Sequence, residues 1–246
     1  MLTTSELLEL AEMPEWSDIS LALYKEFTIK CLLPKTFRYY FINGKKLDVE
    51  FKETAMRHLW AIHHIDGRIK RHKLFEKIDD GLELSNIARN KPMKKRLNDN
   101  RDRIKAFACV YHLLREGDVF FVECGKLKDT DIEIDYLKSK TISSKGVNLG
   151  MRLENDVCIP ITMLIDRTID PNKTIRGLME FNVAKMEIWE DGNIIEVRHY
   201  NYASKIKRRK NTSKYCKCNN TVKTPSCFRT NTYPEKLKQM KLKNKK

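Results

Sequence analysis

The sequence has few of the residues that define fibrous, low-complexity or membrane-spanning chains. Its 246 residues include nine glycines and seven prolines, which excludes a collagen-like or low-complexity chain. No apolar run approaches the roughly 18 residues that a membrane-spanning helix needs, so we expect no membrane partner. Three Trp, nine Tyr and ten Phe exclude wholesale disorder, and we expect a folded domain with a substantial core.

Common catalytic motifs are missing too. The sequence contains no G-x-G-x-x-G or G-x-x-x-x-G-K-[ST] loop to cradle phosphates, no G-x-S-x-G nucleophile turn and no H-E-x-x-H zinc motif. These absences argue against a nucleotide-hydrolysing or dinucleotide enzyme, and we expect no cofactor.

Acidic residues are nearly absent from the C-terminal segment. Residues 204–246 carry 15 Lys and Arg but a single acid, Glu235, whereas residues 1–203 carry 33 basic and 32 acidic residues. The chain is therefore predicted to be a nearly neutral body with a basic, flexible tail. Such a tail typically meets a polyanion, and we favour nucleic acid over an anionic membrane or a merely solubilising role. The predicted phosphate contacts are Lys205, Lys207, Arg208, Arg209 and Lys210.

The seven cysteines do not form a disulfide pattern. Their number is odd and four lie in apolar segments, which is typical of a reduced, intracellular protein. The N-terminal residues include acidic side chains where a secretory signal has Lys or Arg, so we expect a cytoplasmic protein. Cys216, Cys218 and Cys227 could be three zinc ligands, but they lack a fourth and the usual pair spacing. We favour free thiols and no metal.

Helical signals dominate the first half of the chain. Thr3 and Glu6 fit a capping box, and helices are expected at 20–32, at 53–65 and, as one long helix, at about 91–115. Asn43-Gly44 lies between two alternating runs and predicts a hairpin with a type I′ turn, in which both residues have positive φ.

Strand signals dominate the second half. Alternation predicts strands near 119–122, 132–136, 147–153 and 157–165, with an antiparallel turn at 154–156 and a further hairpin around Asp191-Gly192. Pro160 inside a strand indicates an edge position or a bulge. The predicted fold class is α+β, with N-terminal helices, a hairpin, and a long helix packed on a mostly antiparallel sheet. We divide the chain into a helical segment 1–36, an α+β domain 37–203 and the tail 204–246.

Two clusters of polar residues could carry chemistry. Asp48, Glu50 and Lys52 fit a metal-dependent nuclease, although the exposed face of an amphipathic strand explains them as well. His58 lies beside the apolar stripe of its helix and could open toward a cleft as an acid or base. His63 lies on the stripe itself and His64 follows it. The alternative for each of these three is a helix-surface or core-edge histidine, which we favour for His63.

A serial set of short motifs resembles a known family. These are Arg57-His58-Leu59 after the hairpin, Asp135-Tyr136-Leu137-Lys138, Leu149-Gly150 and Pro160-Ile161-Thr162. Their order over residues 37–167 is similar to that of the phage-type nucleases related to barnase, EndoU, the tRNase colicins and RelE. In that family a Gly often follows the His-Leu pair closely, whereas this chain has Trp60-Ala61.

The resemblance implies an RNase-like fold and metal-independent cleavage of RNA. It implies that His58 is the general acid or base and Thr162 a phosphate donor. Lys138 and Arg152 would supply phosphate charge, and Tyr136 would stack a base or supply a hydroxyl, with core packing as the alternative for Tyr136. It also implies a phage or mobile element acting in a bacterial host cell, with a protein inhibitor or host protein as a further partner. The alternatives are an inactive binding module of the same fold, acting in host takeover or defence evasion, and a metal-dependent DNase.

Overall fold

The computed structural model describes residues 1–122, 125, 127 and 132–200. The chain divides into two units, Met1–Tyr202 and Ala203–Lys246, and everything below concerns the first. The predicted basic tail, with its five phosphate contacts and three cysteines, lies outside the described residues. Among the helices that the structure describes, none has both the length and the apolar character to span a bilayer.

The helices are short. Thr3 caps the first helix through the predicted capping box with Glu6. The predicted helix at 20–32 forms, as an α-helix that Ser20 caps and a π-helical end over Thr28–Leu32. The α-helices are α1 Thr4–Glu9, α2 Leu21–Phe27, α3 Met56–Leu59, α4 Ile62–Ile65, α5 Leu74–Asp79, α6 Lys91–Asp99, α7 Arg101–Phe107 and α8 Val110–Glu116.

Two of the predicted continuous helices are broken. The predicted helix at 53–65 is interrupted at Ala61, whose φ of 58° and ψ of 14° are left-handed. The predicted long helix at 91–115 is three helices, separated at Asn100 and at Cys109. Asn100 turns its side-chain amide back onto the Arg96 carbonyl at 2.9 Å, and Cys109 donates its thiol to the Glu12 carbonyl at 3.1 Å. Both residues have backbone conformations, near φ −100° and ψ 5–10°, that do not continue an α-helix.

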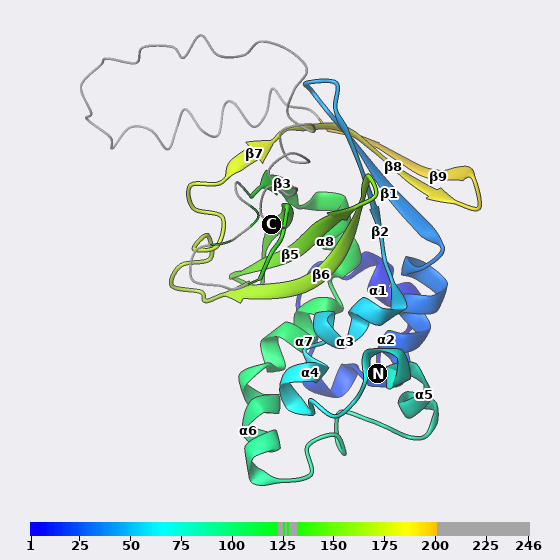
Figure 1. Ribbon diagram of the computed structural model, residues 1–246, viewed down its shortest axis with the longest axis vertical. Helices are drawn as coiled ribbons and strands as arrows, with labels where there is room; N and C mark the ends of the chain where they lie inside the picture. The colour runs from blue at the N-terminus through cyan, green and yellow to red at the C-terminus, as the bar shows by residue number, and fades with distance from the viewer. Residues whose placement is uncertain (123–124, 126, 128–131, 201–246) are drawn as a thin grey trace, which may run out of the picture. The chain divides into compact units, whose positions relative to one another are not determined.

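A single nine-stranded sheet holds the rest of the described chain, so the α+β class is confirmed. Its order is β7-β3-β4-β5-β6-β2-β1-β8-β9, and only the β2–β6 pairing is parallel. Figure 1 shows this sheet curled, with most helices gathered beyond one end of its central strands. The strands are β1 Lys35–Phe41, β2 Lys46–Glu50, β3 Asp118–Phe121, β4 Tyr136–Ile142, β5 Lys145–Glu154, β6 Val157–Asp166, β7 Met179–Phe181, β8 Val183–Glu190 and β9 Asn193–His199.

The turns explain the strand pairing. The hairpin at Asn43-Gly44 is confirmed, but only Gly44 has positive φ, so the turn is not type I′. The turn between β5 and β6 is confirmed, with Asn155 and Asp156 both at positive φ. The bulge predicted at Pro160 is also confirmed, because the register shifts where Met151 faces Pro160 and Gly150 faces Thr162.

The two faces of the sheet bury different clusters. Aromatic and aliphatic residues of β1, β2 and β8, such as Tyr39, Val49 and Met186, join the main core with residues of α1, α2, α7 and α8. On the other face, Phe120, Leu137 and Ile134 form a smaller cluster that Ile161 and Leu164 border. The bulge in β6 lies beside this second cluster, and it positions the site described next.

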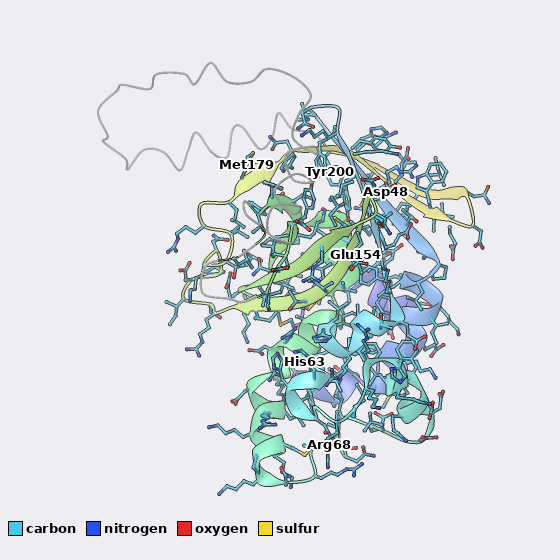
Figure 2. The ribbon with its side chains drawn as sticks, in the orientation of Figure 1. Asp48, His63, Arg68, Glu154, Met179 and Tyr200 are labelled. Carbon is cyan, nitrogen blue, oxygen red and sulfur yellow. The ribbon has the colours of Figure 1, made fainter. Side chains whose placement is uncertain are left out.

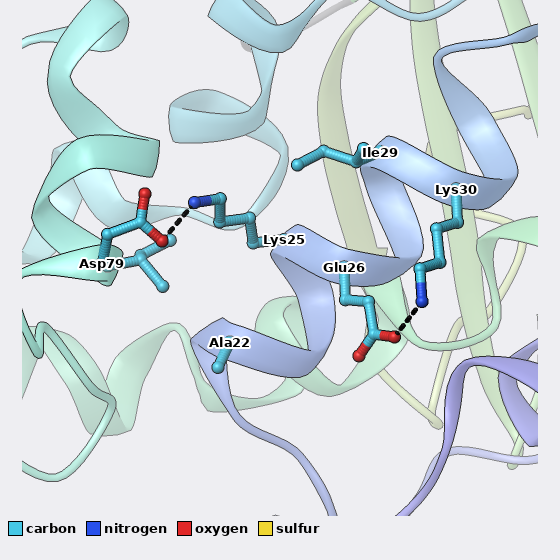
Figure 3. A pocket seen from close by; sticks show the side chains of 7 residues that line it. Ala22, Lys25, Glu26, Ile29, Lys30 and Asp79 are labelled. Carbon is cyan, nitrogen blue, oxygen red and sulfur yellow. Dashed lines mark hydrogen bonds and ion pairs between the residues drawn. The ribbon is translucent and has the colours of Figure 1, made fainter.

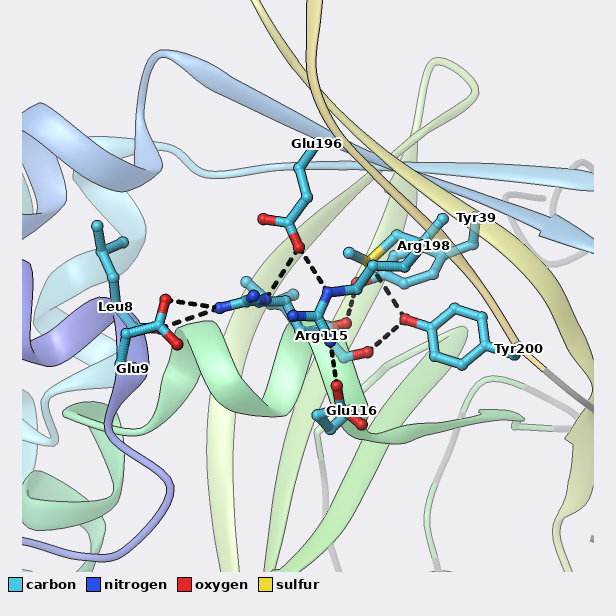
Figure 4. A network of polar contacts seen from close by, with 10 residues as sticks. Leu8, Glu9, Tyr39, Arg115, Glu116, Glu196, Arg198 and Tyr200 are labelled. Atoms are coloured by element: carbon cyan, nitrogen blue, oxygen red, sulfur yellow. Dashed lines mark hydrogen bonds and ion pairs between the residues drawn. The ribbon is translucent and has the colours of Figure 1, made fainter.

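A network of charged side chains fastens the last described strand to the helices (Figure 4). Glu196 of β9 bridges Arg115 of α8, at 3.1 Å, and Arg198. Arg115 also reaches Glu9 of α1 at 3.1 Å, and the Tyr200 hydroxyl donates to the Arg115 carbonyl. Because Arg115, Glu196 and Arg198 are only partly exposed, the network stabilises the β9 end of the sheet more than an isolated surface pair would.

Candidate functional site

A pocket of about 500 Å³ opens between the helices α3, α4 and α7 and the outer face of β5 and β6. This volume is in the range of small-molecule sites. In Figure 2, His63 marks its helical side and Glu154 its sheet side. The lining residues are Lys52, Thr54, Ala55, His58, His63, His64, Arg71, Arg103, Ile132, Arg152, Glu154, Ile159, Ile161 and Thr162.

The helix break at Ala61 brings three histidines together. In a continuous helix, His58 and His63 would point about 140° apart, because each residue turns the helix by about 100°. Instead, the rings of His58 and His63 lie 4.1 Å apart, and those of His63 and His64 lie 3.8 Å apart. His63, for which we favoured a helix-surface or core-edge position, is half-buried and lines the pocket.

Hydrogen bonds fix the protonated nitrogen of two of these rings. His63 Nδ1 lies 3.3 Å from the Arg57 carbonyl oxygen, which can only accept, so Nδ1 carries the proton and Nε2 the lone pair. His64 Nε2 lies 3.0 Å from Arg103 Nη1, which can only donate, so this Nε2 is the acceptor.

All three histidines are held neutral at pH 7. Burial, together with the neighbouring His64 and His58, lowers the pKa of His63 to about 3. Partial desolvation also lowers the pKa of His58, with contributions from Arg57 and Arg103, and that of His64, with contributions from Arg103 and His58. Neutral imidazoles can accept a proton, as a general base must.

Arg103 of α7 joins the elements of the pocket. Its Nη2 donates to the His58 carbonyl at 2.8 Å and to Thr162 Oγ1 at 3.0 Å, while Nη1 donates to His64. Its Nε is buried without a hydrogen-bond partner, and burial lowers the pKa of the guanidinium to about 10. Within the described part of the chain, no carboxylate lies within 4.0 Å of this guanidinium.

The pocket carries excess positive charge. Its lining includes four permanent cations, Lys52, Arg71, Arg103 and Arg152, but one carboxylate, Glu154. Glu154 is already paired with Lys52 at 2.5 Å. An anion that enters the pocket therefore meets unneutralised charge, and its phosphate oxygens would find several donors.

Thr162 lies at the bottom of the pocket because of the bulge and of Gly150. It is almost fully buried and faces Gly150 on β5. A Cβ atom at Gly150 would stand 2.7 Å from Thr162 Cγ2, so the glycine makes room for the threonine. The carbon atoms of Ile132, Ile159 and Ile161 provide an apolar wall beside the charged groups.

The structure brings together three of the five residues predicted for the body, His58, Thr162 and Arg152. Arg152 also donates to the Glu133 carbonyl at 3.2 Å. Tyr136 and Lys138 of β4 pair with Met151 and Leu149, so they lie on the core face and outside the pocket lining.

The surroundings of these two residues explain their placement on the core face. Tyr136 packs against Phe121 and Phe181, which agrees with the core-packing alternative, and burial raises its pKa to about 12. Lys138 is buried, with Nζ 4.1 Å from the centre of the Tyr39 ring. Both residues follow Asp135, whose carboxylate accepts the Leu153 N–H at 2.8 Å and so orders the β5 edge. We therefore assign neither to the pocket.

In the alternative of a metal-dependent nuclease, Asp48 and Glu50 would bind the metal ion, but both carboxylates already accept hydrogen bonds within the protein. Asp48 accepts two bonds of 2.8 Å from Arg38, and Glu50 accepts one of 2.8 Å from Thr36. Lys52, the third residue of that pattern, turns into the pocket instead. Among the residues that the structure describes, no group of three or more His, Cys, Asp or Glu is arranged to hold a metal ion.

A second hollow lies between α2 and α5 (Figure 3). Its charged side chains pair with one another, Lys25 with Asp79 and Lys30 with Glu26. Because these charges are already neutralised, this hollow lacks the uncompensated charge of the histidine pocket.

Residues 25–201 match the family described as phage-Barnase-EndoU-ColicinE5/D-RelE like nuclease4. The match covers most of the chain, and the histidine pocket lies wholly within it. The chain therefore belongs to this phage-type nuclease family, as the resemblance predicted. No curated protein and no solved structure matches the chain.

The sequence placed His64 beside His58 and His63 on one predicted helix without giving it a role, and it gave no sign of Arg103. Arg103 lies on the densely charged side of a predicted helix, among Arg101, Asp102 and Lys105, and nothing in the sequence distinguishes it from these neighbours. Only the packing of α7 against β6 turns this one side chain inward.

Proposed function

We propose that this protein cleaves RNA without a metal ion, by general acid and base catalysis in the histidine pocket. The observation that carries the proposal is Arg103, a half-buried cation without a carboxylate partner among the described residues, held between His58, His64 and Thr162. Membership of a nuclease family supports a nucleic-acid substrate. RNA is favoured because its 2′-hydroxyl supplies a nucleophile inside the substrate.

The reaction needs one base and one acid. The base removes the 2′-hydroxyl proton as the 2′-oxygen forms a bond to phosphorus. The bond from phosphorus to the 5′-oxygen then breaks, and the acid gives that oxygen a proton. The products are a 2′,3′-cyclic phosphate and a free 5′-hydroxyl. Donors must meanwhile stabilise the charge that develops on the non-bridging oxygens.

Each role has a candidate in the pocket. His58 is the proposed acid or base, because it lines the pocket and its ring makes no hydrogen bond to the described residues. Thr162, Arg152 and Arg103 are the proposed phosphate donors. The apolar wall of Ile159 and Ile161 would contact the ribose or base. The basic tail would add affinity without sequence preference.

A cleavage assay on three substrates tests the proposal. Purified protein and its His58→Ala variant are incubated with total RNA, single-stranded DNA and duplex DNA, each with EDTA and with Mg²⁺. We expect cleavage of RNA in EDTA and its loss, by 100-fold or more, in the variant. The matched control is His199→Ala, an exposed histidine on β9, which should cleave like the wild type.

Two other results would point to the alternatives. Intact but retarded nucleic acid in every lane would indicate a binding module of the same fold. The lowered pKa of all three histidines favours that alternative, since the free pocket then offers no protonated imidazole as an acid. Cleavage only with Mg²⁺, lost in Asp48→Asn, would instead indicate the metal-dependent DNase. If the protein is a binding module, we would look for its partner among host proteins or inhibitors in the cytoplasm of the bacterial host.

A further inference from the structure

Arg103 differs from Arg38 and Arg115, two other partly buried arginines, in what it binds. Arg38 and Arg115 each meet at least one carboxylate, whereas all three hydrogen bonds of Arg103 go to neutral acceptors. A planar guanidinium matches two oxygens of a phosphate and binds them more strongly than it binds neutral groups. Arg103 therefore has acceptors in the free protein that an incoming phosphate can replace.

One of these bonds also controls His64. The Nε2 lone pair of His64 accepts the proton of Arg103 Nη1, and a protonated Nε2 has no lone pair to offer. The bond to Arg103 and a doubly protonated His64 thus exclude each other. As long as the bond persists, His64 is kept from taking up a proton.

We propose that a phosphate group of the substrate displaces Arg103 from His64, and that the freed His64 then takes up a proton and becomes the acid of the pocket. Two hydrogen bonds move in this step, since Nη1 and Nη2 turn from His64 and Thr162 to two phosphate oxygens. The proton comes from solvent and goes to His64 Nε2. The inference rests on the proposed function only in naming RNA phosphate as the anion.

The charges around His64 agree with this step. Arg103 faces it from α7 and His58 from α3, and the His63 ring lies 3.8 Å from it on the same helix, α4. Lys52, Arg71 and Arg152 add positive charge to the same pocket, against Glu154 alone. A phosphate anion placed among these groups offsets the repulsion that holds His64 neutral. The lowered pKa of all three histidines leaves the free pocket without an acid, and phosphate binding would supply one.

The test measures protonation directly and uses no RNA. The ring signals of the full-length protein are titrated by NMR with and without inorganic sulfate, a tetrahedral dianion that does not itself titrate in this range. The His64→Gln variant assigns the His64 signal. We expect saturating sulfate to raise the proton affinity of His64 by about tenfold or more, which is one pKa unit. The His199 signal should not change.

Variants of Arg103 separate this mechanism from simple charge screening. In Arg103→Ala, His64 should already have the raised proton affinity without sulfate, and sulfate should add little. Arg103→Lys keeps the positive charge but has a single donor group. It takes the place of Arg103→Ala in this test if the alanine variant does not fold. Arg101→Ala, an exposed arginine of the same helix, is the matched control and should behave as wild type.

Three outcomes would overturn the inference. They are the absence of sulfate binding, sulfate binding without a change at His64, and a His64 titration that Arg103→Ala leaves unaltered. Since cleavage is not measured, a protein that fails to cut RNA could still show the displacement. Conversely, a cleaving protein whose His64 ignores sulfate would refute only the displacement.

Discussion

Gly150 and Thr162 face each other across β5 and β6 so closely that a Cβ atom on the glycine would lie 2.7 Å from Thr162 Cγ2. The same Cβ would stand 3.1 Å from Ile134, so neither neighbour leaves room for a methyl group. We expect Gly150→Ala to lower the free energy of unfolding by about 1–3 kcal/mol, as overpacking does. Displacement of Thr162 should also reduce RNA cleavage by about tenfold or more.

Chemical unfolding and the cleavage assay measure these two effects. Gly67→Ala is the control, because a Cβ there meets nothing closer than 3.9 Å and its φ is not positive. A Gly150→Ala protein with wild-type activity would mean that the position of Thr162 does not matter for the reaction.

His63 should make the stability of the protein depend on pH. Its pKa is about 3 in the folded protein, because it is buried beside His64 and His58, against about 6.5 in an unfolded chain. Between these values the unfolded state binds the proton and the folded state does not, so stability falls as pH falls from 6.5 toward 3. At pH 5 the loss from this group is about 2 kcal/mol relative to pH 7.

Urea unfolding at pH 7 and pH 5 tests this dependence. We expect His63→Gln, which cannot titrate, to lose about 2 kcal/mol less than the wild type between the two values. His72→Gln, an exposed histidine of the same region, should follow the wild type. Equal losses in wild type and His63→Gln would show that His63 titrates as an ordinary surface histidine does.

Periodicity predicted where helices and strands form, but not where the helices break. Apolar residues repeat at helical spacing on both sides of Ala61, and no proline or glycine marks the interruption. His58 could be proposed because its family-like motif is local in sequence. The contacts of His63, His64 and Arg103 depend on how three helices pack, and no short motif encodes that packing. The left-handed conformation of Ala61 is one that glycine adopts without steric cost.

Ala61→Gly should therefore cost little. A left-handed conformation costs an L-residue about 1 kcal/mol, and glycine removes that cost while losing a buried methyl group of similar value. We expect the free energy of unfolding to change by less than about 1 kcal/mol. Ala106→Gly is the matched control, since Ala106 is equally buried but lies within α7.

The control should lose about 2 kcal/mol, from helix propensity and the methyl group together. Thermal or urea unfolding of both variants gives the comparison. Equal losses at the two positions would show that Ala61 carries no backbone strain.

The basic segment after the described domain should determine how strongly binding depends on salt. Each phosphate contact of a single-stranded nucleic acid contributes about −0.7 to the slope of log K against log salt. Replacing Lys205, Lys207, Arg208, Arg209 and Lys210 by Gln should make this slope shallower by about 3.5 if all five contact phosphates. Fluorescence anisotropy of labelled RNA, measured in a His58→Ala background so that the RNA stays intact, gives the slope over a range of salt concentrations.

The control for this prediction removes charge elsewhere. Lys91, Lys94, Lys95 and Arg96 are exposed on α6, and their replacement by Gln lowers the net charge by four. If salt dependence reflected only the net charge of the protein, both sets of substitutions would flatten the slope to a similar extent. A large change for residues 205–210 and a small one for α6 would identify direct phosphate contacts. An unchanged slope after the first set would place the dominant contacts in the pocket around Arg103.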